Sequence, residues 1–199
     1  MQISWKPIFI FVWELVKMVI IALIIIVPIR YFLIQPFFVQ GASMEPNFED
    51  GQYLVIDEIS YRFREPARGE VVVFKYPYSD TNEYFIKRIV GLPNETVKVS
   101  NNEITIINKD NPNGIIVKEP YLSSSLVTDS YDKTEWNLKP DEYFLMGDNR
   151  TVSYDSRRFG PIQKKYITGR VWFRAFPFSV AQVFSVPPNP APILSPIAK

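Results

Sequence analysis

The sequence predicts an all-β domain of antiparallel sheets, carried on one N-terminal transmembrane helix. An apolar run near the N-terminus is long enough to cross a bilayer. The chain after it consists of short runs rich in β-branched and aromatic residues, separated by turn-forming residues. No long amphipathic helical pattern and no internal repeat follows the apolar run. We therefore expect packed or coiled antiparallel sheets.

The transmembrane helix is expected over about Val12 to Ile34. Crossing a bilayer takes roughly 20 residues at about 1.5 Å of rise each, and Met18 to Ile29 carries no charge. A buried core helix and a cleavable signal peptide, cut near Val39-Gln40-Gly41, remain open as alternatives. The length of the apolar run, and Arg30 before that cleavage point, favour an uncleaved anchor.

Three segments follow from this placement. Residues 1–35 are expected to form a cytoplasmic stub and the anchor, because Lys6 and Lys17 favour a cytoplasmic N-terminus. Residues 36–185 are expected to form an extracytoplasmic β domain. Residues 186–199 are rich in proline and are expected to be a disordered tail.

The β domain is predicted from period-two and β-branched patterns. The polar stretch from Ser123 to Pro140 is expected to be an irregular surface excursion. The expected strands are Tyr53–Ile56, Glu70–Phe74, Tyr84–Val90, Thr96–Val99, Glu103–Ile107, Gly114–Val117, Tyr143–Met146 and Gly169–Phe173.

The composition excludes several kinds of chemistry. The net charge is +1, from 22 basic and 21 acidic residues, so nothing indicates a nucleic-acid partner. The chain has no cysteine and no histidine. Thiol nucleophiles, Ser-His-Asp triads and histidine-ligated zinc are therefore impossible. A general base would have to be Lys, Asp, Glu, Tyr or an N-terminal amine.

Ser43 is the first candidate nucleophile. It follows the small residues Gly41 and Ala42, which allow another backbone to approach its hydroxyl, and it lies shortly after the anchor. A solvated turn leaving the membrane is the simpler interpretation of this segment alone.

Lys87 is the candidate base. Strand alternation places it on one face with Phe85 and Ile89, where desolvation would lower its pKa. An ordinary solvent-facing charge is the simpler interpretation of the strand alone.

A third polar segment runs from Gly147 to Arg157, directly after an expected core strand. It gathers short polar and charged side chains, which indicates a rigid hydrogen-bonded loop. A surface loop with a salt bridge would explain the charges equally well, but not their position at the end of a core strand.

In order and spacing, these three segments resemble the catalytic signature of the type I signal peptidases. The matching residues are Ser43-Met44-Glu45-Pro46, Lys87-Arg88-Ile89-Val90-Gly91-Leu92-Pro93 and Gly147-Asp148-Asn149-Arg150…Ser153-Tyr154-Asp155-Ser156-Arg157…Gly160. The resemblance extends from the anchor to about Phe178, and the last segment is the most specific.

The resemblance implies a role for each matching residue. Ser43 would be the nucleophile, Lys87 the general base, and Ser153 a residue that orients the lysine amine. Asp155 and Arg157 would stabilise the site by pairing. The remaining implied residues are Asp148 and Arg150, as supporting groups, and Met44 and Gly41, at the substrate cleft.

Two departures from the commoner family pattern stand out. Asn94-Glu95 follows Pro93 where many members have Gly-Asp, and we expect the turn to survive because Asn tolerates a left-handed conformation. Gly41 occupies a place where some members have a serine that assists the oxyanion. The oxyanion hole would then depend on backbone amides, chiefly that of Ser43.

The resemblance implies an endopeptidase that removes signal peptides from exported preproteins after Ala-x-Ala-like sites. Its partners would be those signal peptides and the lipid bilayer, in a single-pass protein of a bacterial-type cell membrane, with no metal, organic cofactor or nucleic acid. Two alternatives remain: a membrane-tethered, non-catalytic peptide-binding β domain, and a Ser–Lys peptidase that cleaves itself.

Overall fold

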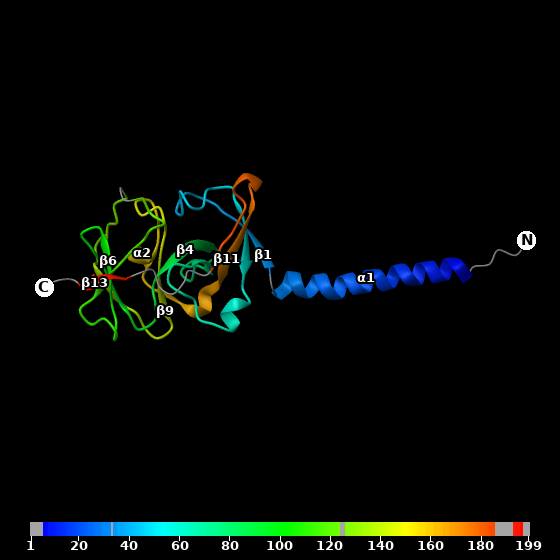
Figure 1. Ribbon diagram of the computed structural model, residues 1–199, viewed down its shortest axis with the longest axis horizontal. Helices are drawn as coiled ribbons and strands as arrows, with labels where there is room; N and C mark the ends of the chain where they lie inside the picture. The colour runs from blue at the N-terminus through cyan, green and yellow to red at the C-terminus, as the bar shows by residue number, and fades with distance from the viewer. Residues whose placement is uncertain (1–5, 33, 124–125, 186–192, 197–199) are drawn as a thin grey trace, which may run out of the picture.

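The computed structural model describes residues 6–32, 34–123, 126–185 and 193–196. It confirms an all-β domain preceded by one long helix (Figure 1). The helices are α1 Lys6–Phe32 and α2 Ser156–Phe159, and the 3-10 turns are η1 Ser60–Arg62, η2 Lys164–Tyr166 and η3 Phe178–Val180. The strands are β1 Ile34–Phe38, β2 Tyr53–Asp57, β3 Val71–Lys75, β4 Tyr84–Gly91, β5 Thr96–Ser100, β6 Glu103–Ile107, β7 Ile115–Val117, β8 Glu135–Asn137, β9 Glu142–Met146, β10 Ile162–Gln163, β11 Ile167–Phe176, β12 Gln182–Val183 and β13 Ile193–Pro196.

Helix α1 projects from the domain as a single rod (Figure 1). Its stretch Pro7–Val27 is long and apolar enough to cross a membrane, and none of it is buried inside the protein. A long apolar helix that the domain does not cover is typical of a membrane anchor and differs from a helix buried in the core of this domain. The helix begins at Lys6, earlier than the predicted Val12. It also ends earlier than the predicted Ile34, because Ile34 already pairs with Asp57 as the first residue of β1.

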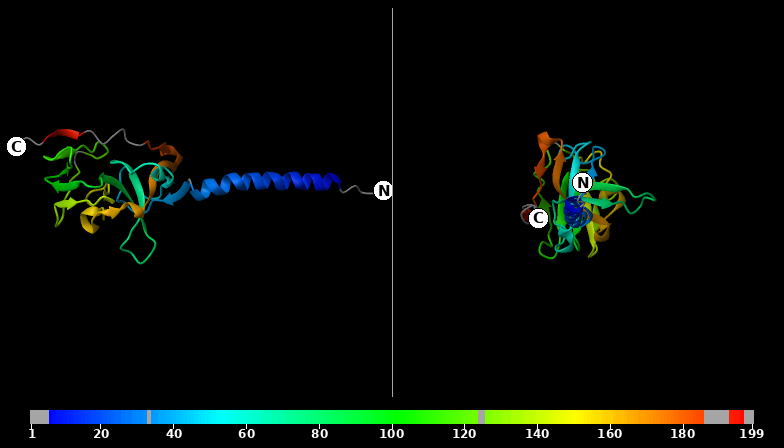
Figure 2. Two further views of the ribbon diagram at one scale, coloured as in Figure 1. Left: turned by 90° about the horizontal axis from the view of Figure 1, so that it is seen from below. Right: turned by 90° about the vertical axis from the view of Figure 1, so that its right-hand side faces the viewer.

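The strands form two antiparallel sheets. The right-hand view of Figure 2 looks at the domain along the axis of α1. The eight-stranded sheet has the order β1-β2-β11-β3-β4-β9-β10, with β12 paired to β11. The five-stranded sheet has the order β13-β7-β6-β5-β8. All eight predicted strands are confirmed, with ends that differ by a few residues.

One core cluster joins the two sheets. Val90 and Phe144 of the larger sheet pack with Val97 and Trp136 of the smaller one. Trp136 is 3% exposed, and its ring lies 4.8 Å from that of Phe144. The predicted excursion Ser123 to Pro140 is therefore wrong for its last part, where strand β8 pairs with β5 and brings Trp136 into the core. A short strand with one apolar residue gives too weak a pattern to be detected.

The tail differs from the prediction at four residues. Ile193–Pro196 form β13, which pairs with β7 at the edge of the smaller sheet. Two adjacent aliphatic residues favour a strand, and an edge position tolerates the proline. The rest of the predicted disordered tail lies outside the described residues.

The turn after β4 is preserved, as predicted. Asn94 has φ 63°, and the Glu95 carboxylate accepts a hydrogen bond from the Leu92 amide at 2.8 Å. Glu95 also pairs with Arg68 at 2.6 Å, and both side chains are buried. This pair links the two sheets.

Candidate active site

Ser43 and Lys87 lie next to each other in the structure. Ser43 lies in the turn between β1 and β2, and Lys87 lies in the middle of β4, opposite Val72 of β3. Although 44 positions separate them in sequence, Lys87 Nζ lies 2.7 Å from Ser43 Oγ. The structure thus brings the two sequence candidates into direct hydrogen-bond contact.

The turn that carries Ser43 is held at both ends. The amides of Val39 and Gly51 donate to the carbonyls of Gln52 and Val39, at 2.9 and 3.0 Å. Within the turn, Gly41 has φ +86°, which strongly favours glycine, and its amide donates to Asp50 Oδ1 at 2.7 Å. The nucleophile candidate therefore sits on a fixed backbone.

Lys87 is buried, with an exposure of 4%. Besides Ser43, its amine donates to the Ile86 carbonyl at 2.9 Å, and it lies 5.5 Å from the centre of the Phe85 ring. Burial lowers the pKa of Lys87 from 10.5 to about 8, although the carboxylates of Asp155 and Asp148 act in the opposite direction. At this lowered pKa a minor fraction of Lys87 is neutral at pH 7, and that fraction is able to accept a proton.

Ser153 lies beside the pair, against Gly147. A Cβ added to Gly147 would be 2.2 Å from Ser153 Oγ and 2.4 Å from the carbonyl oxygen of Ser43. The Ser153 hydroxyl is buried, and within the described part of the chain it has no hydrogen-bond partner. The Ser153 hydroxyl therefore makes no hydrogen bond that stabilises the fold, and it can form one with another group at the site.

Asp155 and Arg157 form a fully buried ion pair, as the resemblance implied. Arg157 Nη2 lies 2.8 Å from Asp155 Oδ2, and both side chains are 0% exposed. Asp155 also accepts the Gly147 amide at 3.0 Å, and Arg157 donates to the Arg150 carbonyl at 2.7 Å. The pair therefore fixes both ends of the loop 147–157.

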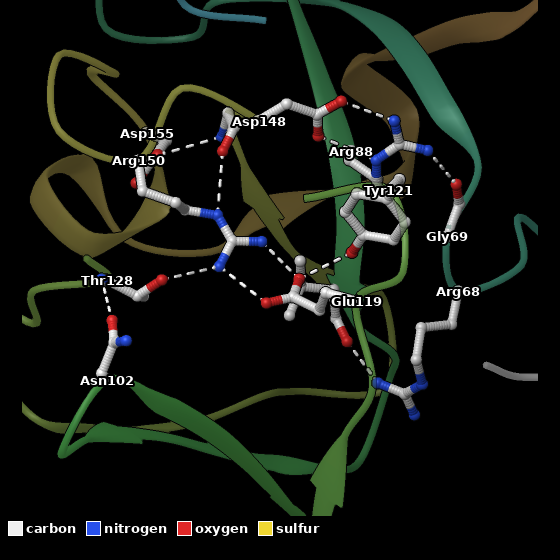
Figure 3. A network of polar contacts seen from close by, with 12 residues as sticks. Arg68, Gly69, Arg88, Asn102, Glu119, Tyr121, Thr128, Asp148, Arg150 and Asp155 are labelled. Atoms are coloured by element: carbon white, nitrogen blue, oxygen red, sulfur yellow. Dashed lines mark hydrogen bonds and ion pairs between the residues drawn. The ribbon is translucent and has the colours of Figure 1, made fainter. Parts of the chain in front are cut away.

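Asp148 and Arg150 each have a partner outside that loop. Arg88, the residue after Lys87, donates to Asp148 at 2.8 and 2.5 Å. Arg150 pairs with Glu119 and donates to the Gly147 carbonyl at 3.0 Å (Figure 3). The loop is thus tied to the lysine strand on one side and to the segment after β7 on the other.

A groove opens onto Ser43 and Lys87, with a volume of about 440 Å³. Its walls come from the end of β1 with the following turn and from the first half of β4. Its lining residues are Phe37, Phe38, Val39, Gln40, Gly41, Ala42, Ser43, Leu54, Val73, Tyr84, Phe85, Ile86, Lys87, Val152 and Tyr154. Gly41 lines this groove.

Met44 is placed otherwise than the resemblance implied. It is 0% exposed and packs with Val39 and Phe48 in the core beneath the groove, and it is not among the lining residues. Met44 follows Ser43 within the turn, and its side chain packs against the core on the side away from the groove. Its place is under the turn.

Sequence reasoning missed four residues of this network. Glu119 and Thr128 contact Arg150, while Tyr121 covers Arg88 and Asn47 donates to Asp148. None belongs to a signature segment, and an isolated Glu or Tyr in an irregular stretch carries no pattern. Among the residues described, no group of three or more acidic side chains is arranged to hold a metal ion.

Comparison with known proteins finds similarity over most of the chain. The family model described as "Signal peptidase, peptidase S26" matches residues 12–176. A signal peptidase I from Bacillus amyloliquefaciens is 37% identical over 171 residues, which is 82% of this chain and 87% of the relative. A probable signal peptidase I-2 from Synechocystis sp. is 34% identical over 168 residues, 82% of this chain and 73% of the relative. A crystal structure of a signal peptidase I from Enterococcus faecalis V583 matches 54% of this chain and 97% of its own, with 25% identity and a TM-score of 0.41.

Proposed function

The chain belongs to the signal peptidase family, peptidase S26, and we propose that Ser43 is its nucleophile and Lys87 its general base. Membership makes it a type I signal peptidase, a serine endopeptidase that acts on the signal peptides of preproteins. One observation carries the assignment of residues: Lys87 Nζ and Ser43 Oγ lie 2.7 Å apart. The lowered pKa of the buried Lys87 agrees with it.

The first half of the reaction is acylation. Neutral Lys87 takes the proton from Ser43 Oγ while this oxygen attacks the scissile carbonyl carbon. The negative charge that develops on the carbonyl oxygen is stabilised by backbone amides, chiefly that of Ser43. The Lys87 ammonium then gives its proton to the leaving amine as the peptide bond breaks. The signal peptide remains as an ester on Ser43.

The second half is hydrolysis of that ester. Lys87, neutral again, takes a proton from a water molecule that attacks the ester carbonyl. The proton passes to Ser43 Oγ as the carbon–oxygen bond breaks, which restores the enzyme. Removing Lys87 therefore stops both halves.

The loop 147–157 supports this pair. Asp155 and Arg157 hold the loop at the site, with Asp148 and Arg150 fixing its outer side. Ser153, buried and with its hydroxyl free to bond, orients the Lys87 amine when the amine turns toward the substrate.

The groove suits an extended peptide. In the eight-stranded sheet, β1 is an edge strand, and β9 pairs with β4 only from Arg88 onward. The residues Tyr84 to Lys87 therefore pair with β3 on one side and face the groove on the other. A substrate strand can add its backbone hydrogen bonds there. The groove's shallow apolar lining favours small side chains, in keeping with Ala-x-Ala sites.

The protein is membrane-anchored, and the finer topology is part of the proposal. Residues 1–35 provide a cytoplasmic stub and a single span of a bacterial-type membrane, and residues 36–185 form the extracytoplasmic catalytic domain, followed by the tail 186–199.

Exposed aromatic side chains continue from the anchor over β1, β2, β11 and η3. Ring centres are 5.0 Å apart for Phe38–Tyr53, 6.1 Å for Tyr53–Phe176 and 5.6 Å for Phe176–Phe178. Amphipathic and aromatic rings of this kind favour the lipid interface.

Cleavage of a preprotein with an Ala-x-Ala site tests the proposal. Detergent-solubilised wild type should cut after the final Ala, and Ser43→Ala and Lys87→Ala should both be inactive while binding the uncut preprotein. If either variant cut at the same bond as wild type, the assigned pair would be wrong. A protein that binds preproteins but never cuts them would be the tethered binding domain.

A further inference from the structure

The segment after β7 contacts all three parts of the chain that carry the proposed chemistry. It runs through Glu119 and Tyr121 and continues directly from the smaller sheet. The Tyr121 carbonyl accepts from Asn47, four residues after Ser43, at 2.9 Å. Its ring lies over Arg88, next to Lys87, and Glu119 pairs with Arg150 in the loop 147–157.

We propose that Tyr121 and Glu119 are positioning residues for Ser43 and Lys87, with Tyr121 acting through Arg88 and Glu119 acting through Arg150. This inference rests on the function proposed above. Neither residue touches the reacting atoms, and neither lies in a signature segment.

The Tyr121 ring covers the Arg88–Asp148 pair. The guanidinium carbon of Arg88 lies 3.9 Å from the ring centre, a stacked contact (Figure 3). Tyr121 and Arg88 also line a pocket of about 400 Å³ on the far side of the Ser43 turn. Arg88 is only 11% exposed beside this pocket; without the ring more of its guanidinium would face water, and the arginine would be freer to leave Asp148.

The Arg88–Asp148 pair affects Lys87 because Asp148 is one of two carboxylates facing it. The other is Asp155, which Arg157 neutralises; the remaining polar neighbours are the Ser43 hydroxyl and the Ile86 carbonyl, and Val72 lies opposite on β3. Arg88 neutralises Asp148. If Arg88 moves away, the uncompensated Asp148 charge favours the lysine ammonium, and Lys87 loses its proton only at higher pH.

Glu119 acts on the other side of the site. It holds the Arg150 guanidinium through both carboxylate oxygens, and the Tyr121 hydroxyl donates to it at 2.6 Å. Arg150 in turn donates to the carbonyl of Gly147 at 3.0 Å. Gly147 is packed against Ser153 and the Ser43 carbonyl. Movement of Arg150 would therefore displace the Gly147 backbone and, with it, both serines.

The test compares full-length variants in detergent, using a preprotein with an Ala-x-Ala site. We measure kcat, KM, the pH midpoint of kcat/KM and the thermal unfolding midpoint for wild type, Tyr121→Leu, Tyr121→Phe and Glu119→Gln. Tyr121→Leu should lower kcat roughly tenfold with little change in KM, and should move the pH midpoint upward. Tyr121→Phe keeps the ring over Arg88 and should restore both values. Glu119→Gln should lower kcat.

Glu95→Gln is the matched control, since it weakens another buried inter-sheet pair, with Arg68, away from the groove. It should lower the unfolding midpoint without moving the pH midpoint. An unchanged kcat and pH midpoint in Tyr121→Leu would overturn the inference, as would equal pH shifts in Glu95→Gln or no rescue by Tyr121→Phe. The proposed function fails separately, if Ser43→Ala or Lys87→Ala still cuts.

Discussion

The backbone carbonyl of Ser43 accepts a hydrogen bond from the amide of Asn149 at 3.1 Å. This bond joins the turn that carries the nucleophile directly to the loop that carries Ser153 and Asp155. The position of the Ser43 hydroxyl therefore depends on both segments, and changes in the loop reach the reaction without touching the substrate.

The rate of cleavage should rise with pH through the pKa of Lys87, which burial lowers to about 8. Only the neutral amine can accept the serine proton, so kcat/KM falls below that pH and levels off above it. Asp148→Asn removes a carboxylate that favours the ammonium and should move the midpoint to lower pH. A pH–rate profile of both proteins provides the measurement. A wild-type midpoint near 10.5, the ordinary value, would contradict the role of burial.

Replacing Lys87 with Met should stabilise the protein while abolishing cleavage. The folded pKa lies below the unfolded value of 10.5, so the unfolded chain binds the proton more tightly and the buried lysine destabilises the fold at neutral pH. The cost is up to about 3 kcal/mol below pH 8 and disappears as the pH rises to 10.5. Denaturant unfolding of wild type and Lys87→Met at pH 7 and pH 10.5 measures it. An equal difference at both pH values would rule out this cause.

Gly147→Ala should lose most activity. Its Cβ would overlap Ser153 Oγ and the Ser43 carbonyl, and the second of these is backbone that cannot rotate away. We expect kcat to fall on the order of 100-fold and stability by about 1–3 kcal/mol. Gly51→Ala is a suitable control, since its Cβ would meet nothing within 4 Å and only its φ of +83° opposes the change. Comparable losses of kcat in the two variants would show that the contact at Gly147 is unimportant.

Breaking the Asp155–Arg157 pair should strongly destabilise the domain. Both side chains are 0% exposed, so Asp155→Asn leaves a buried guanidinium without its counter-charge. The expected cost is about 3–5 kcal/mol in the free energy of unfolding. Lys139→Ala removes a surface pair in which Lys139 is 73% exposed, and should cost less than about 1 kcal/mol. Denaturant titrations compare the two, and a similar small cost for both would contradict the structural role of the buried pair.

The parts predicted well from sequence were those with repeated local patterns. The strands around Val72 and Ile106 alternate or run apolar over several residues, and the apolar run of α1 is unmistakable. Strand β8 was missed because its burial depends on one residue, Trp136, meeting Phe144 of another sheet. A contact between residues of two different sheets cannot be recognised from the pattern of a few neighbouring residues in the sequence.

The candidate site divides in the same way. Ser43 and Lys87 could be singled out because their segments, together with the loop 147–157, match the signal peptidase signature in order and spacing, while the composition leaves few possible bases. Glu119 and Tyr121 could not be singled out from the sequence. Glu119 matters because it pairs with Arg150, 31 positions away, and Tyr121 matters because the fold places its ring against Arg88. Met44 was expected at the cleft because it matches a residue at the cleft edge in the family that the sequence resembles, but here it packs into the core.

Strand β1 begins at Ile34, two positions after α1 ends at Phe32, and the chain then reaches Ser43. At about 3.3–3.6 Å per residue, the nucleophile can stand no more than about 40 Å from the end of the helix. Because β1 is paired along its length with β2, residues 34–38 belong to the folded sheet and do not form a flexible linker. With α1 spanning the membrane as proposed, Ser43 would stand at a nearly constant height above the bilayer. We then expect a signal peptide to be cut only where the segment between its apolar core and its cleavage point is long enough to span that height, so that length would be selected as well as side chains.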